Sequence, residues 1–420
     1  MEENNRITGA LSRFFRAAGR WLRRNLTAIF CVVAAVAITF SITFLSCMEL
    51  FNSRILQLEA NGEGILKIAR VKQYYDEYYV GGELDEEKMI DYALYGLVSG
   101  TGDKYGSYFN KEDFARYMNS NQGDLTGIGV NVIYKQDTNE MKVVRLYPDS
   151  PAEKAGILPG DLITGVDGET LADLGYYMLV ERVMGEEGTQ VTIDILRDGQ
   201  PMQFTMERAK LEIQSVTHEM LDGNVGYLAI SEFNNKTTEQ FRLAMEDILA
   251  QEDLQGIVFD VRNNGGGDAN VIWKVLDMLL PEGNIYKLVD KAGNEQTFDS
   301  DEAAMLDGQL PVTVLVNGNT ASAAELFAAA LQDYDYAEIV GETTFGKGTG
   351  LSVVDVGDGS GLAISTTLYY TPSGKNIEGV GVIPDYEVSL TEEQWNNFYE
   401  LSREEDPQLQ KALAVLRGEE

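Results

Sequence analysis

Histidine, cysteine and positive charge are scarce in this chain of 420 residues. The single histidine, His218, leaves almost no material for hydrolysis through a serine–histidine pair. Both cysteines, Cys31 and Cys47, lie in one apolar run near the N-terminus, so the rest of the chain has no disulfide and no thiolate metal site. Lysine and arginine total 33 against 67 acidic residues, a net charge of −34, which argues against nucleic acid as a partner.

The few basic residues near the N-terminus precede an uncharged apolar segment. They are Arg6, Arg13, Arg16, Arg20, Arg23 and Arg24. A helix over residues 26–47, rising about 1.5 Å per residue, reaches roughly 33 Å and would span a bilayer. Because basic residues favour the inner side, we predict a cytoplasmic segment 1–25, a transmembrane helix 26–47 and an extracytoplasmic remainder. A cleaved signal peptide is the alternative, although the run is long and lacks an Ala-x-Ala site.

Residues 48–118 are predicted to be a helical N-terminal segment. Apolar residues recur there at helical spacing, in two groups: Ile65, Ile68, Ala69 and Val71, then Met89, Ala93, Leu94 and Leu97. We interpret this segment as a packing or dimerising module, which leaves a homo-oligomer open.

From residue 120 to residue 208 the pattern changes to short strands and tight turns. Residues 127–133, 142–146 and 190–196 alternate or run apolar like strands. Between them stand Ser150-Pro-Ala-Glu-Lys-Ala-Gly156 and Leu158-Pro-Gly-Asp-Leu-Ile163, a short helix and a tight turn. With these motifs in this order, the segment resembles a PDZ domain.

The PDZ resemblance implies a site for peptide tails. Backbone N–H groups of Gly127, Ile128 and Gly129 would bind the terminal carboxylate of a peptide, which adds to the sheet edge as a strand. An ordinary strand entry is the alternative interpretation of the two glycines.

Residues 209–390 are predicted to alternate strands with helices. Residues 256–261 form a nearly continuous apolar run, typical of a strand covered on both faces. The unit recurs as strand 312–316, helix 322–331 and strand 337–340. This alternation predicts an α/β layer with sites where strands lead into helix N-termini.

Ser322 and Lys347 are the residues at such positions that predict chemistry. Ser322 begins the helix that follows Asn317-Gly-Asn-Thr-Ala321, and Lys347 lies in the glycine-flanked turn Gly341-Glu-Thr-Thr-Phe-Gly-Lys-Gly348. A serine in this place is more often only a helix cap, and a lone lysine more often a solvated cation. Together they offer a nucleophile and a base, provided that burial lowers the lysine pKa from about 10.4 to roughly 7 to 8.

Backbone donors are predicted beside Ser322. The N–H group of Ala323 would face an oxyanion formed when Ser322 attacks a carbonyl carbon. The glycine run 265–267 would bring a second donor close, because glycine lets the backbone approach a substrate. A plain strand-to-helix turn is the alternative for these glycines.

The same lysine also fits most of a phosphate-binding loop. Gly341-x-x-x-x-Gly346-Lys347 is followed by Gly348 where that loop has the serine or threonine that holds magnesium. Residues 351–356 also favour a strand where the loop requires a helix. We therefore do not expect nucleotide binding.

Several separated motifs occur together and in order. They are Asp260-Val-Arg-Asn-Asn-Gly-Gly-Gly267, Ala321-Ser-Ala-Ala-Glu325, Leu331-Gln-Asp333, Val340-Gly-Glu-Thr-Thr-Phe-Gly-Lys-Gly348, Tyr370-Thr-Pro-Ser-Gly-Lys375 and Gly381-Val-Ile-Pro-Asp385. With them, nearly the whole chain beyond the apolar run resembles the C-terminal processing peptidases, also called tail-specific proteases. The resemblance implies a crotonase-like α/β protease core with an inserted PDZ domain.

The family resemblance also implies roles for single residues. It implies Ser322 as nucleophile, Lys347 as general base, Ala323 and Gly266 as oxyanion donors and Asp333 as a supporting carboxylate. No cofactor and no metal are implied, and the acidic run 299–302 is interpreted as a solvated loop rather than a calcium site.

One departure from the family pattern concerns the base. Relatives usually carry glutamine four residues after the lysine, whereas this chain has Leu351, preceded by Gly350. The group that orients Lys347 is therefore open, with Thr349 and Ser352 as polar candidates.

The sequence thus predicts a single-pass serine endopeptidase on the outer face of a bacterial membrane. It would cleave protein substrates near their C-termini after the PDZ domain captures an exposed apolar tail, and that domain would also gate the site. A catalytically silent scaffold that only binds partner tails is the alternative, and Leu351 keeps it open. Residues 391–420, acidic and predicted helical, either assist assembly or form a solvated tail.

Overall fold

The computed structural model describes residues 64–135, 138–301, 304–306 and 308–419. The predicted cytoplasmic segment and transmembrane helix, residues 1–47, lie outside these residues. In the described part of the chain, no helix combines the length and the apolar character that crossing a membrane requires.

The chain divides into two compact units, one up to Met89 and one from Ile90 onward. The described part of the first unit contains a helix over residues 64–78. Helix α3 (Glu86–Ser99) begins in the first unit and continues into the second, where β1 (Ser107–Phe109) and α4 (Lys111–Gln122) follow. Within the predicted helical segment, residues 64–78, 86–99 and 111–118 are helical, whereas 79–85 and 100–106 are loops and β1, which periodicity did not predict, is a strand.

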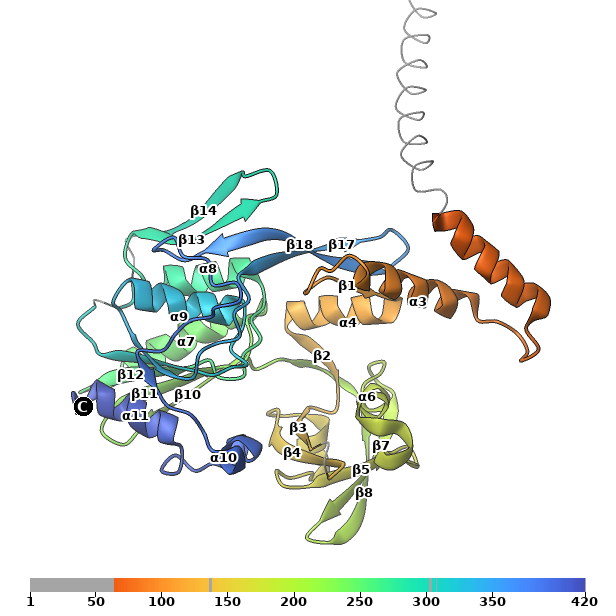
Figure 1. Ribbon diagram of the computed structural model, residues 1–420. Coiled ribbons are helices and arrows are strands. Elements are labelled where there is room, and N and C mark those ends of the chain that lie inside the picture. Colours follow the sequence, from red (N-terminus) through yellow and green to blue (C-terminus); the bar gives the residue numbers. More distant parts are fainter. Residues whose placement is uncertain (1–63, 136–137, 302–303, 307, 420) are drawn as a thin grey trace, which may run out of the picture. The chain divides into compact units, whose positions relative to one another are not determined.

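An antiparallel sheet with two helices forms the part of the second unit around residues 130–207 (Figure 1). Its elements are β3 (Val130–Lys135), β4 (Glu140–Leu146), α5 (Pro151–Ala155), β5 (Leu162–Val166), β6 (Glu169–Thr170), α6 (Leu171–Val183), β7 (Gln190–Arg197) and β8 (Gln200–Glu207). The strand order is β3-β4-β5-β7-β8, with β6 paired to β5, so β3 is an edge strand. A two-stranded sheet of β2 (Asp124–Gly127) and β9 (Ala209–Glu212) leads into and out of this part.

The short helix α5 shows how the sequence specifies this part. The Ser150 side chain accepts a hydrogen bond from the N–H of Glu153 at 3.2 Å, which caps the helix. Pro151 fits the first turn, where its missing N–H has no partner to lose. Gly156 ends the helix in the left-handed region, at φ 92°.

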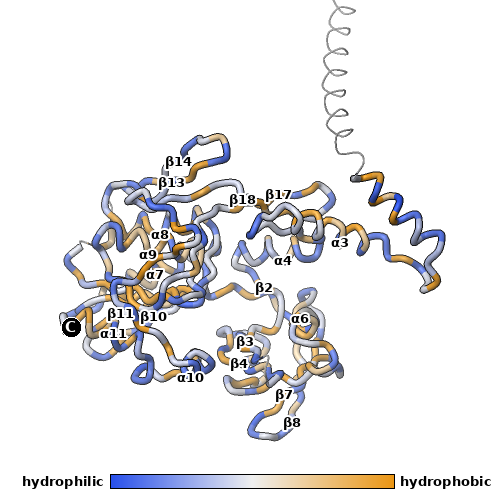
Figure 2. The backbone as a smooth tube through the Cα atoms, in the orientation of Figure 1, coloured by the Kyte–Doolittle hydropathy of each residue, from blue (hydrophilic) through white to orange (hydrophobic). Residues whose placement is uncertain are grey.

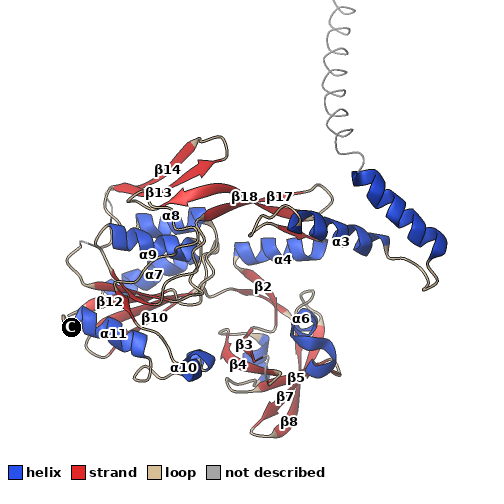
Figure 3. Ribbon diagram, viewed as in Figure 1, coloured by secondary structure: helices blue, strands red, loops and turns tan. Residues whose placement is uncertain are grey.

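A second sheet, of six strands, forms the centre of the remaining chain (Figure 3). In spatial order its strands are β10 (Val216–Leu221), β11 (Val225–Ile230), β12 (Gly256–Asp260), β15 (Val312–Val316), β16 (Glu338–Gly341) and β19 (Tyr386–Glu387). All neighbours from β11 to β19 are parallel, and β10 is antiparallel to β11. This is the alternation of strands and helices that the apolar runs predicted.

Helices cover both faces of this sheet. On one face Leu228, Phe259 and Val314 pack with α7 (Thr237–Leu249), α8 (Ala269–Asp277) and α9 (Ala323–Asp333). On the other face Tyr227, Val258 and Leu315 pack with α11 (Pro407–Leu416). Because successive residues of a strand point to opposite faces, a sheet covered on both faces needs apolar residues at every position. Figure 2 shows hydrophobic stretches at β11 and α9.

The segment 391–419 packs against the chain's own sheet. It contains α10 (Glu392–Asn396), a 3-10 turn (Phe398–Glu400) and α11. Leu409, Ala412 and Leu413 of α11 are buried, at 1%, 0% and 7% exposure. Of the two uses left open for this segment, the solvated tail does not describe α11, because its apolar side is in the core.

The buried Arg262 connects α11 to the end of β12. Its Nη2 lies 2.6 Å from Asp260 Oδ2 and its Nη1 lies 2.8 Å from Asp406 Oδ2. Nη1 also donates to Gln408 Oε1 at 3.0 Å. Since Arg262 opens the loop of the glycine run, the C-terminal helix fixes where that loop begins.

A third sheet lies around β18 (Gly361–Tyr370). Its other strands are β13 (Gly283–Asp290), β14 (Glu295–Ser300), β17 (Thr349–Asp355) and β1. β17 pairs with β18 along 361–368, whereas β13 and β1 pair with the two ends of β18 on its other side. β18 therefore brings β17, which begins two residues after Lys347, and β1, which begins two residues after Tyr105, into one sheet.

Candidate active site

Ser322 has an unusual backbone conformation. It precedes α9 with φ 56° and ψ −119°, a region that residues with a side chain rarely adopt. Its N–H donates to Glu325 Oε2 at 2.9 Å, and its carbonyl accepts from Leu326 N–H at 3.0 Å and from the Tyr369 hydroxyl at 3.3 Å. An ordinary helix cap is extended at this position, so the backbone of Ser322 is strained.

The buried carboxylate of Glu325 joins the serine loop to the lysine loop. Oε2 accepts from the N–H of Ser322 at 2.9 Å and from the N–H of Lys347 at 2.8 Å. Oε1 accepts from the Thr344 hydroxyl at 2.5 Å and from the N–H of Gly346 at 2.7 Å. Burial raises the pKa of Glu325, and these four donors act against the rise. One side chain thereby fixes both segments that carry the predicted chemistry.

Lys347 is half-buried. Burial lowers the pKa of its amine below the usual 10.5, while the negative charges of Glu378, Glu325 and Asp103 act in the opposite direction without cancelling the shift. A lowered pKa is what a lysine needs in order to act as a base near neutral pH.

The Lys347 amine lies against an aromatic ring. Its Nζ is 5.0 Å from the ring centroid of Tyr105. The Tyr105 hydroxyl donates to Glu378 Oε1 at 2.8 Å, and Glu378 Oε2 accepts from Gly348 N–H and from the Thr349 hydroxyl, both at 2.8 Å. Although burial tends to raise the pKa of Glu378, these donors hold it below its ordinary value. Glu378 is therefore an anion beside the lysine loop.

Sequence reasoning missed both Tyr105 and Glu378. Neither polar candidate for orienting Lys347 bonds to it: the Thr349 hydroxyl donates to Glu378, and the Ser352 hydroxyl pairs with that of Thr366 at 2.7 Å. Tyr105 stands in the segment Asp103-Lys-Tyr-Gly-Ser107, which has no periodicity or motif that would single it out.

The two predicted oxyanion donors differ in availability. Ala323 is the first residue of α9, where an N–H has no partner within the helix. Gly266 lies directly beside Ser322, since a Cβ built on it would come within 2.8 Å of the Ser322 Cβ. However, its N–H donates to Asn264 Oδ1 at 2.8 Å, because the Asn264 side chain folds back over the loop. The neighbouring Gly265 is exposed.

The structure does not bring Asp333 to this site. Asp333 is the last residue of α9, about 16 Å from Ser322 at the rise of an α-helix. Its Oδ2 accepts from Ser373 N–H at 3.0 Å, and Oδ1 lies 3.7 Å from Lys375 Nζ. Asp333 thus supports the turn around residues 371–375, not the serine or the lysine.

The geometry supports neither a serine–histidine pair with His218 nor a phosphate-binding loop at Lys347. His218 is on β10, three inter-strand spacings from β15, the strand that precedes Ser322. These spacings put His218 about 14 Å from that strand. Its Nε2 instead lies 2.8 Å from Asp247 Oδ2. β17 follows Lys347 as a strand, where a phosphate-binding loop would continue as a helix.

The predicted peptide-binding residues line an apolar groove. Gly127 ends β2, Ile128 and Gly129 lie between β2 and β3, and Gly129 has φ 78°. The cavity, about 130 Å³, runs between β3 and α6, and its lining includes Val130, Val132, Val180, Val183 and Met184. Because β3 is an edge strand, a peptide has a free edge beside this groove.

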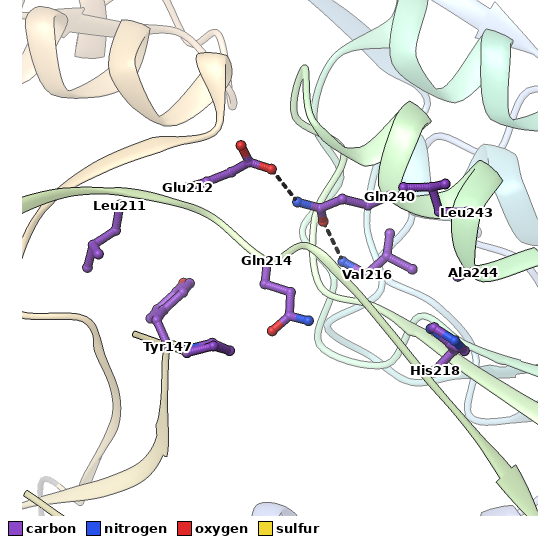
Figure 4. Close-up of a pocket in the computed structure, with 10 residues that line it drawn as sticks. Tyr147, Leu211, Glu212, Gln214, Val216, His218, Gln240, Leu243 and Ala244 are labelled. Carbon is purple, nitrogen blue, oxygen red and sulfur yellow. Dashed lines mark hydrogen bonds between the residues drawn. The ribbon is translucent and has the colours of Figure 1, made fainter. Parts of the chain in front are cut away.

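A larger pocket of about 440 Å³ lies elsewhere, where β9 joins β10 (Figure 4). Tyr147 and Leu211 face Val216 and His218 across it, and Gln240 of α7 binds the connecting chain. The Gln240 side chain accepts from Val216 N–H at 3.1 Å and donates to Glu212 Oε1 at 3.2 Å. Neither Ser322 nor Lys347 lines this pocket, so it is separate from the candidate site.

Comparisons with known proteins agree with this arrangement. Residues 224–388 match Peptidase family S41, and residues 142–197 match the PDZ domain family. The chain is 32% identical over 370 residues to the carboxy-terminal-processing protease of Bartonella bacilliformis, covering 80% of this chain and 84% of that relative. It is 30% identical over 348 residues to the carboxyl-terminal-processing protease of Synechocystis sp., covering 81% and 80%. An S41 protease structure from Bacteroides fragilis has the same fold, with a TM-score of 0.56, 19% identity and coverage of 82% and 94%.

Proposed function

As the chain belongs to the carboxy-terminal-processing proteases of peptidase family S41, we propose that Ser322 and Lys347 carry out its peptide hydrolysis. The predicted family resemblance and PDZ domain are confirmed, and the protein is a serine-type peptidase. One observation carries the assignment of the pair: Glu325 Oε2 binds the N–H groups of both residues, so their loops are held together.

In the proposed first step, Ser322 Oγ attacks the carbonyl carbon of the substrate while the neutral Lys347 amine takes the hydroxyl proton. The negative charge that develops on the carbonyl oxygen is stabilised by the N–H of Ala323 at the start of α9. The C–N bond then breaks, and the leaving amine takes the proton from Lys347. Water repeats these steps on the acyl-enzyme, releasing the acid and restoring Ser322.

Gly266 would contribute mainly space beside Ser322. Its own N–H becomes a second oxyanion donor if the Asn264 side chain releases it, and Gly265 N–H is the alternative donor. In both cases the lack of a Cβ lets the substrate carbonyl approach. The parallel sheet and the serine at a helix start also support a crotonase-like core.

The PDZ domain is proposed to select substrates by their tails. The apolar groove between β3 and α6 suits an apolar C-terminal side chain, and N–H groups of residues 127–129 suit the carboxylate. The captured chain would then reach Ser322, and the domain would gate access. The substrates are therefore proteins with exposed apolar C-terminal tails.

The location of the enzyme is proposed from its sequence. Residues 26–47 would anchor it in a bacterial membrane, with residues 1–25 in the cytoplasm and the protease outside. Its acidic composition gives no support to a nucleic-acid partner.

A cleavage assay with the full-length protein in detergent tests the proposal. Unfolded substrates would differ only in their last three residues, apolar or charged. We expect cleavage of the apolar-tailed substrate by the parent, by Ser402→Ala and by Lys274→Ala, both exposed controls, and none by Ser322→Ala or Lys347→Ala. Binding of tails without cleavage by any of these proteins would instead favour the scaffold. Cleavage by Ser322→Ala would refute the assigned nucleophile.

A further inference from the structure

The Lys347 amine needs a group that holds it toward Ser322, and the position four residues later does not supply one. Leu351 lies on β17 with 37% of its surface exposed. An apolar side chain neither donates to nor accepts from an amine. Some other part of the chain must restrict the four rotatable bonds of the lysine, because a loosely held base loses much of its effect.

The segment before the PDZ domain reaches this amine. Asp103 binds to β18, accepting from Ser365 N–H at 2.9 Å and from its hydroxyl at 2.6 Å. Two residues later, the Tyr105 ring lies 5.0 Å from Lys347 Nζ. The Tyr105 hydroxyl is fixed by Glu378, which it bonds at 2.8 Å, and by Lys104, whose Nζ donates to it at 2.9 Å.

Glu378 in turn fixes the loop of the lysine. Its Oε2 binds the N–H of Gly348, the residue after Lys347, and the hydroxyl of Thr349. Ring, carboxylate and lysine loop thus form a closed set of contacts: Lys347 to Tyr105, Tyr105 to Glu378, and Glu378 back to Gly348.

We propose that Tyr105 and Glu378 are positioning residues for the base. The ring of Tyr105 holds the Lys347 side chain, a role that Leu351 cannot fill. This inference rests on the proposed Ser322 and Lys347 pair. It means that the active site is incomplete without a residue from outside the segment that matches the peptidase family, residues 224–388.

The arrangement also suits the proton transfer. Lys347 is neutral before attack and positively charged once it holds the Ser322 proton, so positive charge develops in the transition state. An aromatic face and a nearby carboxylate both stabilise that charge. The anions that act on Lys347 are Glu378, Glu325 and Asp103. The nearby cation is Lys104, whose Nζ donates to the Tyr105 hydroxyl and lies 4.8 Å from the centroid of its ring. Burial lowers the pKa of the amine beforehand, against the pull of these anions.

Three variants of the full-length enzyme test the inference through kcat, KM and the pH profile of kcat/KM. Tyr105→Phe keeps the ring but loses the hydrogen bond to Glu378, and we expect a fall in kcat that is smaller than that of Tyr105→Ala. Tyr105→Ala removes the ring and admits water, and we expect kcat to fall about tenfold to thirtyfold at unchanged KM, with the ascending limb moving toward pH 10.5. Glu378→Gln removes a negative charge but keeps the side-chain shape, so the limb should move to lower pH.

A general loosening of the fold would not move the ascending limb of the pH profile to higher pH in Tyr105→Ala and to lower pH in Glu378→Gln. Tyr92→Leu, on an exposed part of α3, is the control and should match the parent. An unmoved limb in Glu378→Gln, or in a folded Tyr105→Ala, overturns the inference, and Glu378→Gln alone decides it if Tyr105→Ala does not fold. If Ser322→Ala and Lys347→Ala abolish cleavage while these variants behave as the parent, only this inference fails. If Lys347→Ala cleaves normally, the proposed pair itself fails.

Discussion

The backbone N–H groups of Ser322 and Lys347 donate to the same oxygen atom, Oε2 of Glu325, at 2.9 and 2.8 Å. Any displacement of one loop therefore strains the hydrogen bond of the other. Because all four partners of this carboxylate are donors, Glu325 can be satisfied only as an acceptor.

Replacing Glu325 by glutamine should harm both stability and activity. The amide would direct an NH₂ group at two of the donors and leave buried N–H groups unpaired, which we expect to cost about 3 kcal/mol. Urea unfolding measures the loss, and kcat should fall with it because the two loops separate. Glu338→Gln, an exposed carboxylate, is the matched control. A Glu325→Gln protein as stable as its control would contradict this role.

The conformation of Ser322 predicts a stability gain on its removal. Ser322→Gly should abolish cleavage and raise the free energy of unfolding by about 1 kcal/mol, because glycine adopts φ 56° and ψ −119° without strain. Ser322→Ala should abolish cleavage without this gain, since alanine keeps the Cβ. Equal unfolding midpoints for the two variants would argue against strain at this position.

The lowered pKa of Lys347 predicts how stability changes with pH. Between that pKa and 10.5 the unfolded state binds more protons than the folded state, so this lysine makes the protein more stable as pH rises. Lys347→Met should therefore exceed the parent in stability at neutral pH, by about 1.4 kcal/mol for each pH unit that separates the folded pKa from the unfolded one. The difference should shrink toward pH 10.5, and unfolding curves at several pH values measure it. A difference independent of pH would be inconsistent with a buried amine of lowered pKa.

Gly129 allows a test of the peptide-binding loop. A Cβ there would lie 2.4 Å from the Ser150 Cβ, in addition to the strain of φ 78°. We expect Gly129→Ala to destabilise the protein by about 2 kcal/mol and to weaken tail binding. Gly160→Ala is the control, because its φ is 96° but nothing lies within 4 Å of the added atom. Tail peptides measured by fluorescence anisotropy should bind this control as they bind the parent.

Local patterns predicted a large part of this structure. Strands buried on both faces give continuous apolar runs in the sequence, as β12 does. The capping serine, the proline and the glycine around α5 predict where that helix begins and ends. Ser322 and Lys347 could be named because each lies in a short segment with its own turn chemistry. These features depend on neighbours a few residues away.

The rest depends on contacts that no local pattern records. Tyr105 bonds a carboxylate 273 positions later in the chain, and the Asn264 side chain takes the N–H of Gly266. Asp333 shows the opposite error, since a resemblance placed it at the site although it lies at the far end of α9 from Ser322.

The bond from Arg262 to Gln408, 146 positions later, has a consequence for folding. Before α11 has folded onto the sheet, the start of the loop beside Ser322 lacks its partners in that helix. The start of the loop beside Ser322 therefore gains its final geometry only after α11 has packed against Arg262.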